Sequence, residues 1–320
     1  MRPRKNLSTL SRRSLVLARN KILIFALKLM VSAASLFLIF RKADMAQVGR
    51  ILKETGMPSF LSASAIYIAS QFLSTLRWRG LILERFPVMK LFSLYMIGSF
   101  FSTFLPGLVG GDAVRAYYLN KDAGKISTTL ASVFLDRYLG YVSLMTIGIA
   151  AFPFSLDTFG GSRYTWLMPS LFISFVVSSA LFFGLQLGRR FRIMTEFYNY
   201  FSIIRERRGI IAKAFIISAV IQFMNFFIVL LLARRIGTEV SLLHLAVLLP
   251  IVITAASLPI SISGIGVREG AFVLLLGLVG VTPEAATSLS LAWFFSVFMG
   301  SLPGLVFYML HFRKQETEHA

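Results

Sequence analysis

Long apolar runs separated by short charged segments fill most of this 320-residue chain. A helix of about 20 apolar residues is long enough to cross the hydrocarbon core of a bilayer, where it satisfies its own backbone hydrogen bonds. The runs of that kind are residues 22–40, 59–76, 127–152, 166–187, 210–232 and 285–310. The pattern therefore predicts an all-α polytopic membrane protein with about six full transmembrane helices.

Two further apolar stretches, residues 91–109 and 242–278, are interrupted by Gly, Pro and charged residues. They contain LPGLVGGDAVR (105–115) and LPISISGIGVREG (258–270), which share a Leu-Pro start and a carboxylate close to an arginine. Irregular backbone at membrane depth is tolerated where it lines a cavity or is buried in protein. A matched pair of broken segments in the two halves of a chain indicates the binding site of a transporter.

Basic residues predict the orientation, because cytoplasmic loops of membrane proteins are enriched in Lys and Arg. The basic segments 1–21, 77–90 and 188–213 are placed inside, so stretch 91–109 begins and ends inside. Stretch 242–278 then begins and ends outside. We therefore expect two oppositely oriented re-entrant helical hairpins, an arrangement typical of an inverted repeat. Residues 41–58 are basic yet fall outside, and we expect an amphipathic segment on the outer surface there.

Composition agrees with one membrane domain at residues 22–311, preceded by a basic cytoplasmic arm (1–21) and followed by a short polar cytoplasmic tail (312–320). The chain is 56% apolar, and its net charge of +19 comes from 33 Lys and Arg against 14 Asp and Glu. The positive-inside bias explains this excess, so no nucleic-acid partner is expected. The first apolar run is too long for a signal-peptide core, so we interpret it as a transmembrane helix with both chain termini cytoplasmic.

Charged residues inside the apolar segments are the candidate site, since burying an unpaired charge in a membrane costs at least about 2.5–3.5 kcal/mol. Asp112 and Arg115 are three apart, on one face of a helix that starts after Gly111, where the helix N-terminus favours an anion. The alternative is that Asp112 is an N-cap and Arg115 a surface charge. Asp136 and Arg137 are interpreted equally well as a salt bridge between helices or as part of a substrate pathway.

Arg268 and Glu269 are adjacent, and adjacent residues do not face each other on a helix. We therefore expect each to meet a partner elsewhere, with the Asp112–Arg115 or Asp136–Arg137 pair as candidates. The residues expected to shape the two hairpins are Pro106, Gly107, Gly110, Gly111, Pro259, Gly264 and Gly266. Three Gly-x-x-x-Gly motifs, at 107/111, 266/270 and 300/304, are typical of close helix contact.

Enzymatic signatures are missing from the sequence: it has no GxSxG, HExxH, Walker A or dinucleotide motif. The chain has no cysteine, and its three histidines are scattered, so neither a metal site nor a cofactor is expected. We therefore do not expect an enzyme. A weaker alternative is an integral-membrane transferase that uses Asp112 or Glu269 as its base.

Several of these motifs together resemble a known family. LPGLVGGDAVR, Asp136-Arg137, PISISGIGVREGAF (259–272) and SLPG (301–304) are similar to the lysylphosphatidylglycerol synthase transmembrane region, also called the flippase-like or UPF0104 family. Arg77-Trp78-Arg79 fits the resemblance, whereas the family usually has Glu-Arg at the Asp136-Arg137 position.

The resemblance implies movement of an aminoacylated phospholipid from the inner to the outer leaflet. It does not imply synthase activity, because the soluble synthase domain of the best-understood members has no counterpart in these 320 residues. We expect a prokaryotic plasma (inner) membrane protein that moves a phospholipid or a lipid-linked headgroup. The alternative is a non-catalytic membrane partner of a separate lipid synthase or glycosyltransferase.

Overall fold

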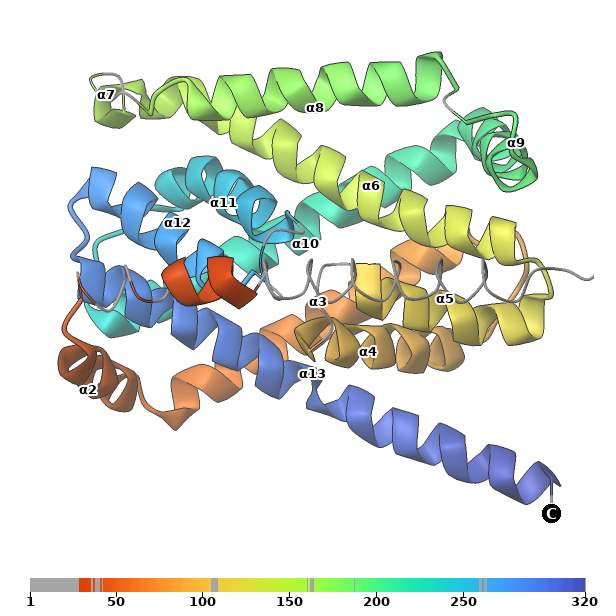
Figure 1. The fold of residues 1–320 in the computed structure, drawn as a ribbon, viewed down its shortest axis with the longest axis horizontal. Coiled ribbons are helices and arrows are strands. Elements are labelled where there is room, and N and C mark those ends of the chain that lie inside the picture. The colour runs from red at the N-terminus through yellow and green to blue at the C-terminus, as the bar shows by residue number, and fades with distance from the viewer. Residues whose placement is uncertain are drawn as a thin grey trace, which may run out of the picture.

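The computed structural model is helical throughout the part of the chain that it describes, which is residues 29–35, 37, 41, 43–104, 109–159, 161, 164–186, 188–258, 261 and 264–319. Its α-helices are α2 (Met45–Thr55), α3 (Met57–Leu81), α4 (Val88–Phe104), α5 (Val109–Ala123), α6 (Ile126–Ala151), α7 (Leu156–Phe159), α8 (Leu167–Gly184), α9 (Arg192–Glu206), α10 (Arg208–Ile236), α11 (Leu242–Ser257), α12 (Val267–Leu276) and α13 (Pro283–His319). Short 3-10 turns follow α6 and α12. This architecture confirms the prediction of an all-α protein (Figure 1).

Five helical segments are long and apolar enough to cross a bilayer: α3, α6 with the turns that follow it to Thr158, α8, α10 and α13 as far as His311. They confirm five of the six predicted spans. The first predicted span, 22–40, lies largely outside the described residues, although 29–35 are helical. The chain is therefore a polytopic membrane protein.

The helices α4, α5, α11 and α12 are shorter, with 17, 15, 16 and 10 residues. At about 1.5 Å per residue, none reaches the roughly 30 Å thickness of the hydrocarbon core. Helix α4 packs against α5, and α11 packs against α12. In Figure 1, α4 and α5 lie toward the end of the bundle that carries α9, whereas α11 and α12 lie toward the end that carries α2.

Two further helices, α2 and α9, lie at opposite ends of the bundle and are seen almost end-on in Figure 1. Helix α2 is the amphipathic segment expected within residues 41–58, and Asp44 caps it by accepting a hydrogen bond from the Ala46 amide at 2.8 Å. Helix α9 was not predicted, because residues 188–213 were interpreted only as a basic loop. It buries Tyr198, Tyr200 and Ile204 against the bundle.

A hydrogen bond anchors α9 to the start of α6, where the Ser127 hydroxyl donates to the Glu196 carboxylate. Arg192 donates to the same carboxylate at 3.0 Å. These two bonds, with the nearby charge of Lys125, hold the pKa of Glu196 below its usual range. Glu196 therefore stays ionised near neutral pH, and protonation in acid weakens its contact with both donors.

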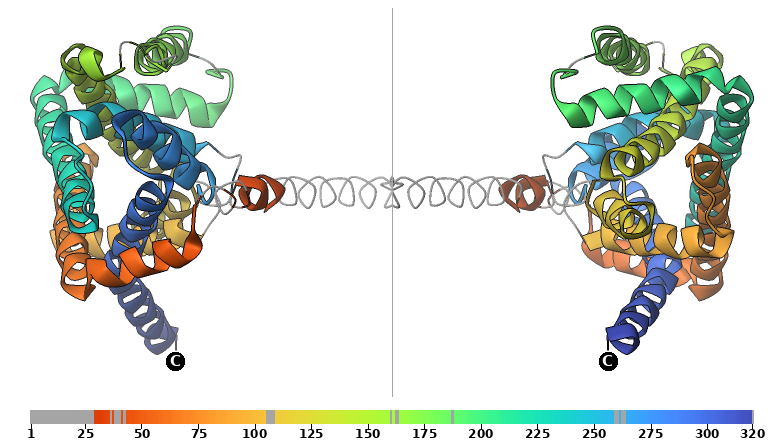
Figure 2. Two further views of the ribbon diagram at one scale, coloured as in Figure 1. Left: turned by 90° about the vertical axis from the view of Figure 1, so that its left-hand side faces the viewer. Right: turned by 90° about the vertical axis from the view of Figure 1, so that its right-hand side faces the viewer.

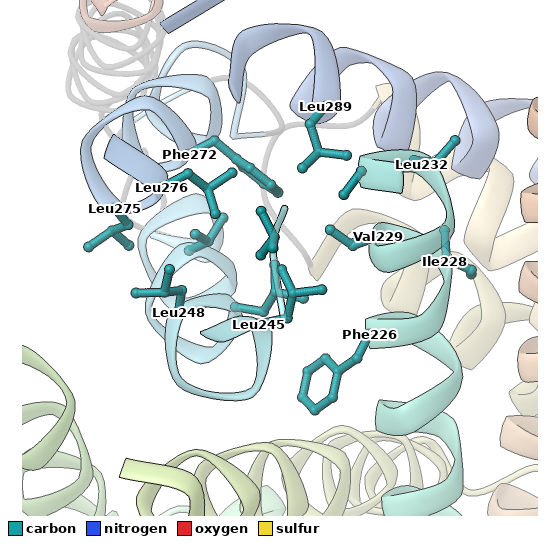
Figure 3. Packing of buried hydrophobic residues seen from close by; sticks show 14 of the residues in the cluster. Phe226, Ile228, Val229, Leu232, Leu245, Leu248, Phe272, Leu275, Leu276 and Leu289 are labelled. Atoms are coloured by element: carbon teal, nitrogen blue, oxygen red, sulfur yellow. The ribbon is translucent and has the colours of Figure 1, made fainter. Parts of the chain in front are cut away.

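Apolar packing between α10, α11, α12 and α13 forms the largest core (Figure 3). Phe226, Leu245, Phe272 and Leu289 are almost fully buried there. Beyond this core, the C-terminal part of α13 projects away from the remaining helices (Figure 2).

The predicted Gly-x-x-x-Gly contacts have different outcomes. A Cβ atom on Gly304 would lie 2.1 Å from the Met96 carbonyl oxygen, and one on Gly300 would lie 2.6 Å from the Tyr67 ring. The 300/304 motif therefore lets α13 approach α4 and α3 closely. A Cβ on Gly270 would have nothing within 4 Å, so the contact expected at the 266/270 motif is wrong for Gly270. Gly107 lies outside the described residues.

Candidate functional site

A fully buried carboxylate, Asp136 on α6, joins charged and polar groups from three other helices. Arg77 on α3 donates from Nε to its Oδ1 at 2.7 Å. Arg115 on α5 donates from Nη1 and Nη2 to its Oδ2, both at 3.1 Å. The Tyr95 hydroxyl on α4 donates to the same oxygen at 3.0 Å. Asp136 therefore ties α3, α4 and α5 to α6 in a region closed to solvent.

Both arginines around Asp136 are held by further contacts. Arg77 also donates to the Ser218 hydroxyl of α10 at 2.8 Å. The Arg115 guanidinium lies 4.4 Å from the ring centre of Tyr95 and 4.8 Å from that of Trp78. Aromatic faces attract a cation, and the attraction grows when water is excluded. These contacts stabilise two positive charges at a depth where solvation by water is lost.

The charged cluster continues toward the surface of the helix bundle through Asp112 on α5. Its Oδ1 lies 3.0 Å from Arg115 Nε, and its Oδ2 accepts a hydrogen bond from Arg137 Nε at 2.8 Å. We call the row Arg77–Asp136–Arg115–Asp112–Arg137 the ion chain. Three arginines and two aspartates give it a net charge of +1.

The two ends of the ion chain differ in exposure. The Asp136 side chain is 0% exposed, that of Asp112 is 14% exposed, and that of Arg137 is 44% exposed. A buried pair costs several kcal/mol to break, whereas the Arg137–Asp112 pair lies at the surface of the helix bundle. The Asp136 end is therefore fixed, and the Arg137 end can exchange its partner.

The sequence-based expectations for this cluster are partly corrected. Asp112 and Arg115 do pair on one face of α5, but α5 begins at Val109, so Asp112 lies in the first turn and is not the N-cap. Arg77 was assigned to a cytoplasmic loop, whereas α3 continues to Leu81 and leaves Arg77 only 5% exposed. Tyr95 was not singled out. The signal that could have located Arg77 is its place within an unbroken helical segment.

Close backbone contact between α4 and α5 places these groups. A Cβ on Gly111 would lie 1.9 Å from the Gly98 carbonyl oxygen and 2.1 Å from Ser102 Oγ. Only a residue without a Cβ lets the helices approach this far. The contact brings Arg115 on α5 beside Tyr95 on α4. Gly110 precedes this contact and is half-buried, whereas Pro106 and Gly107 lie outside the described residues.

A second charged pair begins α12. Glu269 Oε2 accepts a hydrogen bond from the Gly266 amide at 2.6 Å. Its Oε1 accepts hydrogen bonds from Arg268 Nε at 3.0 Å and from the Ser290 hydroxyl of α13 at 3.1 Å. Arg268 and Glu269 therefore contact each other, so the candidate partners Asp112–Arg115 and Asp136–Arg137 are wrong, although both side chains also bond to Ser290 on α13. Glu269 folds back to cap its own helix. This brings its carboxylate within reach of the long Arg268 side chain.

Two glycines shape the backbone before this pair. Gly264 and Gly266 have φ angles of +77° and +85°, which L side chains rarely adopt. A Cβ on Gly264 would also lie 2.9 Å from the Ala256 carbonyl oxygen of α11. Both glycines therefore belong to a tight turn before α12, and their part in a re-entrant hairpin stays a prediction; Pro259 lies outside the described residues.

Neither cluster resembles a metal site. Across the residues that the structure describes, no group of three or more His, Asp or Glu could hold a metal ion. The ion chain instead carries a positive excess and an arginine with free surface, which suits an anionic group.

Comparison with known proteins identifies the family of this chain. No curated protein matches the sequence. The family model for the Lysylphosphatidylglycerol synthase TM region matches residues 25–304, which include the ion chain and the Arg268–Glu269 pair. The match covers well over half of the chain. With two charged clusters set among its membrane helices, the chain belongs to the family of the lysylphosphatidylglycerol synthase TM region.

Proposed function

We propose that this protein moves a phospholipid or a lipid-linked headgroup between the leaflets of the inner membrane. The observation that carries the proposal is the ion chain, which is locked at Asp136 and open at Arg137. A lipid that changes leaflet needs a polar route for its headgroup while its acyl chains remain in hydrocarbon. A partly exposed arginine among membrane helices supplies one polar contact on such a route.

The proposed headgroup binding is an exchange in which a lipid phosphate takes the place of Asp112 on Arg137. Asp112 contacts Arg115 and Arg137 at once, at 3.0 and 2.8 Å. A lipid phosphate can replace Asp112 on Arg137, because Asp112 still keeps Arg115 as its counter-ion. The phosphate then meets a charge-assisted donor, and no carboxylate is left unpaired. The +1 charge of the ion chain favours an anionic group over a cationic one.

Further polar side chains extend this route within the proposal. Tyr67, Gln71 and Ser99 bond to one another between α3 and α4, with Gln71 Nε2 donating to Ser99 at 2.9 Å. Tyr141 lies one helical turn after Arg137 and bonds to Thr254 on α11. These groups lead from the ion chain toward the half of the bundle that holds Arg268 and Glu269.

We further propose that α4–α5 and α11–α12 are re-entrant pairs that enter the membrane from opposite faces. Their lengths and their places toward opposite ends of the bundle support this (Figure 1). Cysteine labelling tests it, because the chain has no cysteine. Arg85→Cys and Lys121→Cys, which flank the first pair, should react from the cytoplasmic side. Glu239→Cys and Thr282→Cys, which flank the second, should react from the other side.

The labelling result that contradicts re-entrance is equally specific. If Arg85→Cys and Lys121→Cys react from opposite sides, the α4–α5 segment crosses the membrane. Exposed Glu54→Cys on α2 and Arg205→Cys on α9 are expected outside and inside, and they should react from opposite sides of the membrane.

Transport itself is tested with purified protein in liposomes. We expect the protein to accelerate the transbilayer movement of a fluorescent anionic phospholipid well above the rate in protein-free liposomes. An unchanged rate with both anionic and aminoacylated lipids would refute the proposal. Co-purification of a lipid synthase or glycosyltransferase, without intrinsic transport, would instead support a role as a membrane partner of that enzyme.

A further inference from the structure

A cavity of about 220 Å³ lies where the end of α3, the end of α5, the start of α6 and helix α9 meet. Its polar lining comes from Glu84, Lys125, Thr128, Thr129, Ser132 and Tyr200. Since a water molecule takes about 30 Å³ of liquid, the volume suits a headgroup of a few heavy atoms. It is smaller than the roughly 300–1,000 Å³ of sites that enclose a whole drug-sized molecule. The cavity therefore fits a headgroup without acyl chains.

One part of this lining donates hydrogen bonds. Lys125 precedes α6 and makes no side-chain cap to it, so the first amides of the helix lack a side-chain acceptor. The hydroxyls of Thr128 and Thr129 line the cavity beside these amides. A cation, two hydroxyl donors and a helix N-terminus together favour a phosphate.

Another part of the lining accepts hydrogen bonds. The Tyr200 hydroxyl donates its proton to the Leu81 carbonyl oxygen at 2.5 Å, and the Ser132 hydroxyl donates its proton to the Thr129 carbonyl oxygen at 2.8 Å. Each oxygen therefore offers only lone pairs to a ligand. Glu84 adds a carboxylate to the lining. This part of the cavity suits an ammonium group.

We propose that the cavity binds a phosphoethanolamine group, with its phosphate on Lys125, Thr128 and Thr129 and its ammonium on Glu84 and Tyr200. The opposite charges of Lys125 and Glu84 select a zwitterion over a simple anion. The Glu84 carboxylate repels a purely anionic headgroup, and the Lys125 ammonium repels a purely cationic one.

The cavity wall is connected to the ion chain through Trp78. Ser132 accepts a hydrogen bond from Trp78 Nε1 at 3.2 Å, and the Trp78 ring lies against Arg115. A headgroup in the cavity is thus separated from the ion chain by one side chain. Binding at this place does not require transport, so the inference stands apart from the proposed function.

The test is calorimetry on the purified protein in detergent with glycerophosphoethanolamine as the probe. We expect binding at least about tenfold tighter than that of inorganic phosphate, ethanolamine or glycerophosphoglycerol, a difference of about 1.4 kcal/mol. Lys125→Gln and Glu84→Gln should each weaken binding about tenfold or more. Lys53→Gln and Glu54→Gln, on exposed parts of α2, are matched controls and should bind like the unchanged protein.

Two results overturn the inference. One is equal affinity for inorganic phosphate and the zwitterion, and the other is unchanged binding in both cavity variants with intact melting temperatures. A second experiment, in nanodiscs of phosphatidylglycerol, distinguishes a group that belongs to a membrane lipid from one that belongs to a soluble compound. Loss of probe binding when phosphatidylethanolamine is added assigns the group to the membrane, and retained binding assigns it to a soluble compound. Binding without lipid transport leaves this inference in place and removes only the proposed function.

Discussion

Replacing Asp136 by Asn should abolish stable folding of the membrane domain, because the change removes the anion shared by two buried arginines. Arg115 keeps Asp112 as a partner, but Arg77 is left with only a serine hydroxyl and a neutral amide nearby. Breaking a buried pair in this way costs about 3–5 kcal/mol. Natural domains have only about 5–15 kcal/mol of net stability, so this loss is large.

Thermal melting and size-exclusion profiles in detergent measure the effect. We expect the Asp136→Asn protein to aggregate or to melt far below the unchanged protein. Asp136→Glu keeps the negative charge between Arg77 and Arg115 and should remain folded. Asp157→Asn, an exposed carboxylate on α7, is the matched control. If Asp136→Asn melts like that control, the buried charge does not hold the helices together.

Replacing Gly111 by Ala should separate α4 from α5. The new Cβ would lie 1.9 Å from the Gly98 carbonyl oxygen, and backbone cannot move aside as a flexible side chain can. Overpacking of a core costs about 1–3 kcal/mol, and contact with backbone places this site at the upper end. The shift also moves Arg115 away from Tyr95, so the ion chain is disturbed as well.

Gly270→Ala is the matched control for this steric effect. Gly270 lies in α12 with nothing within 4 Å of a built Cβ, and Ala is favoured over Gly within a helix by about 0.5–1 kcal/mol. Melting temperatures of the two variants should therefore move in opposite directions. A Gly111→Ala protein that melts like the unchanged protein would show that α4 and α5 are not in backbone contact.

The membrane helices could be predicted because each depends on a local property, the length of an apolar run. Helix α9 could not, since polar residues such as Thr195, Glu196 and Asn199 interrupt its apolar positions and leave no long apolar run. Only the helical period places Tyr198 and Tyr200 against the bundle. A search for amphipathic periodicity in basic loops would have found it.

The candidate site was predicted in its residue types but not in its pairing. Asp112, Arg115, Asp136 and Arg137 form one cluster, as charges at membrane depth must pair. Arg77 was missed because arginines after a membrane span normally mark the cytoplasmic surface. The partners predicted for Arg268 were wrong because residue spacing alone does not reveal its contact with Glu269. Glu269 folds back to cap α12, and the long Arg268 side chain then reaches its carboxylate.

The central claim is that the open end of the ion chain contacts the headgroup of a moving lipid. The most direct measurement is lipid transport by Arg137→Gln in liposomes, beside its melting temperature. We predict transport at least about tenfold slower, equal to about 1.4 kcal/mol in the barrier, with little change in melting because Asp112 keeps Arg115 as its counter-ion. Arg192→Gln, which removes an exposed ion pair within α9, should transport normally. Transport by Arg137→Gln at the unchanged rate would contradict the account.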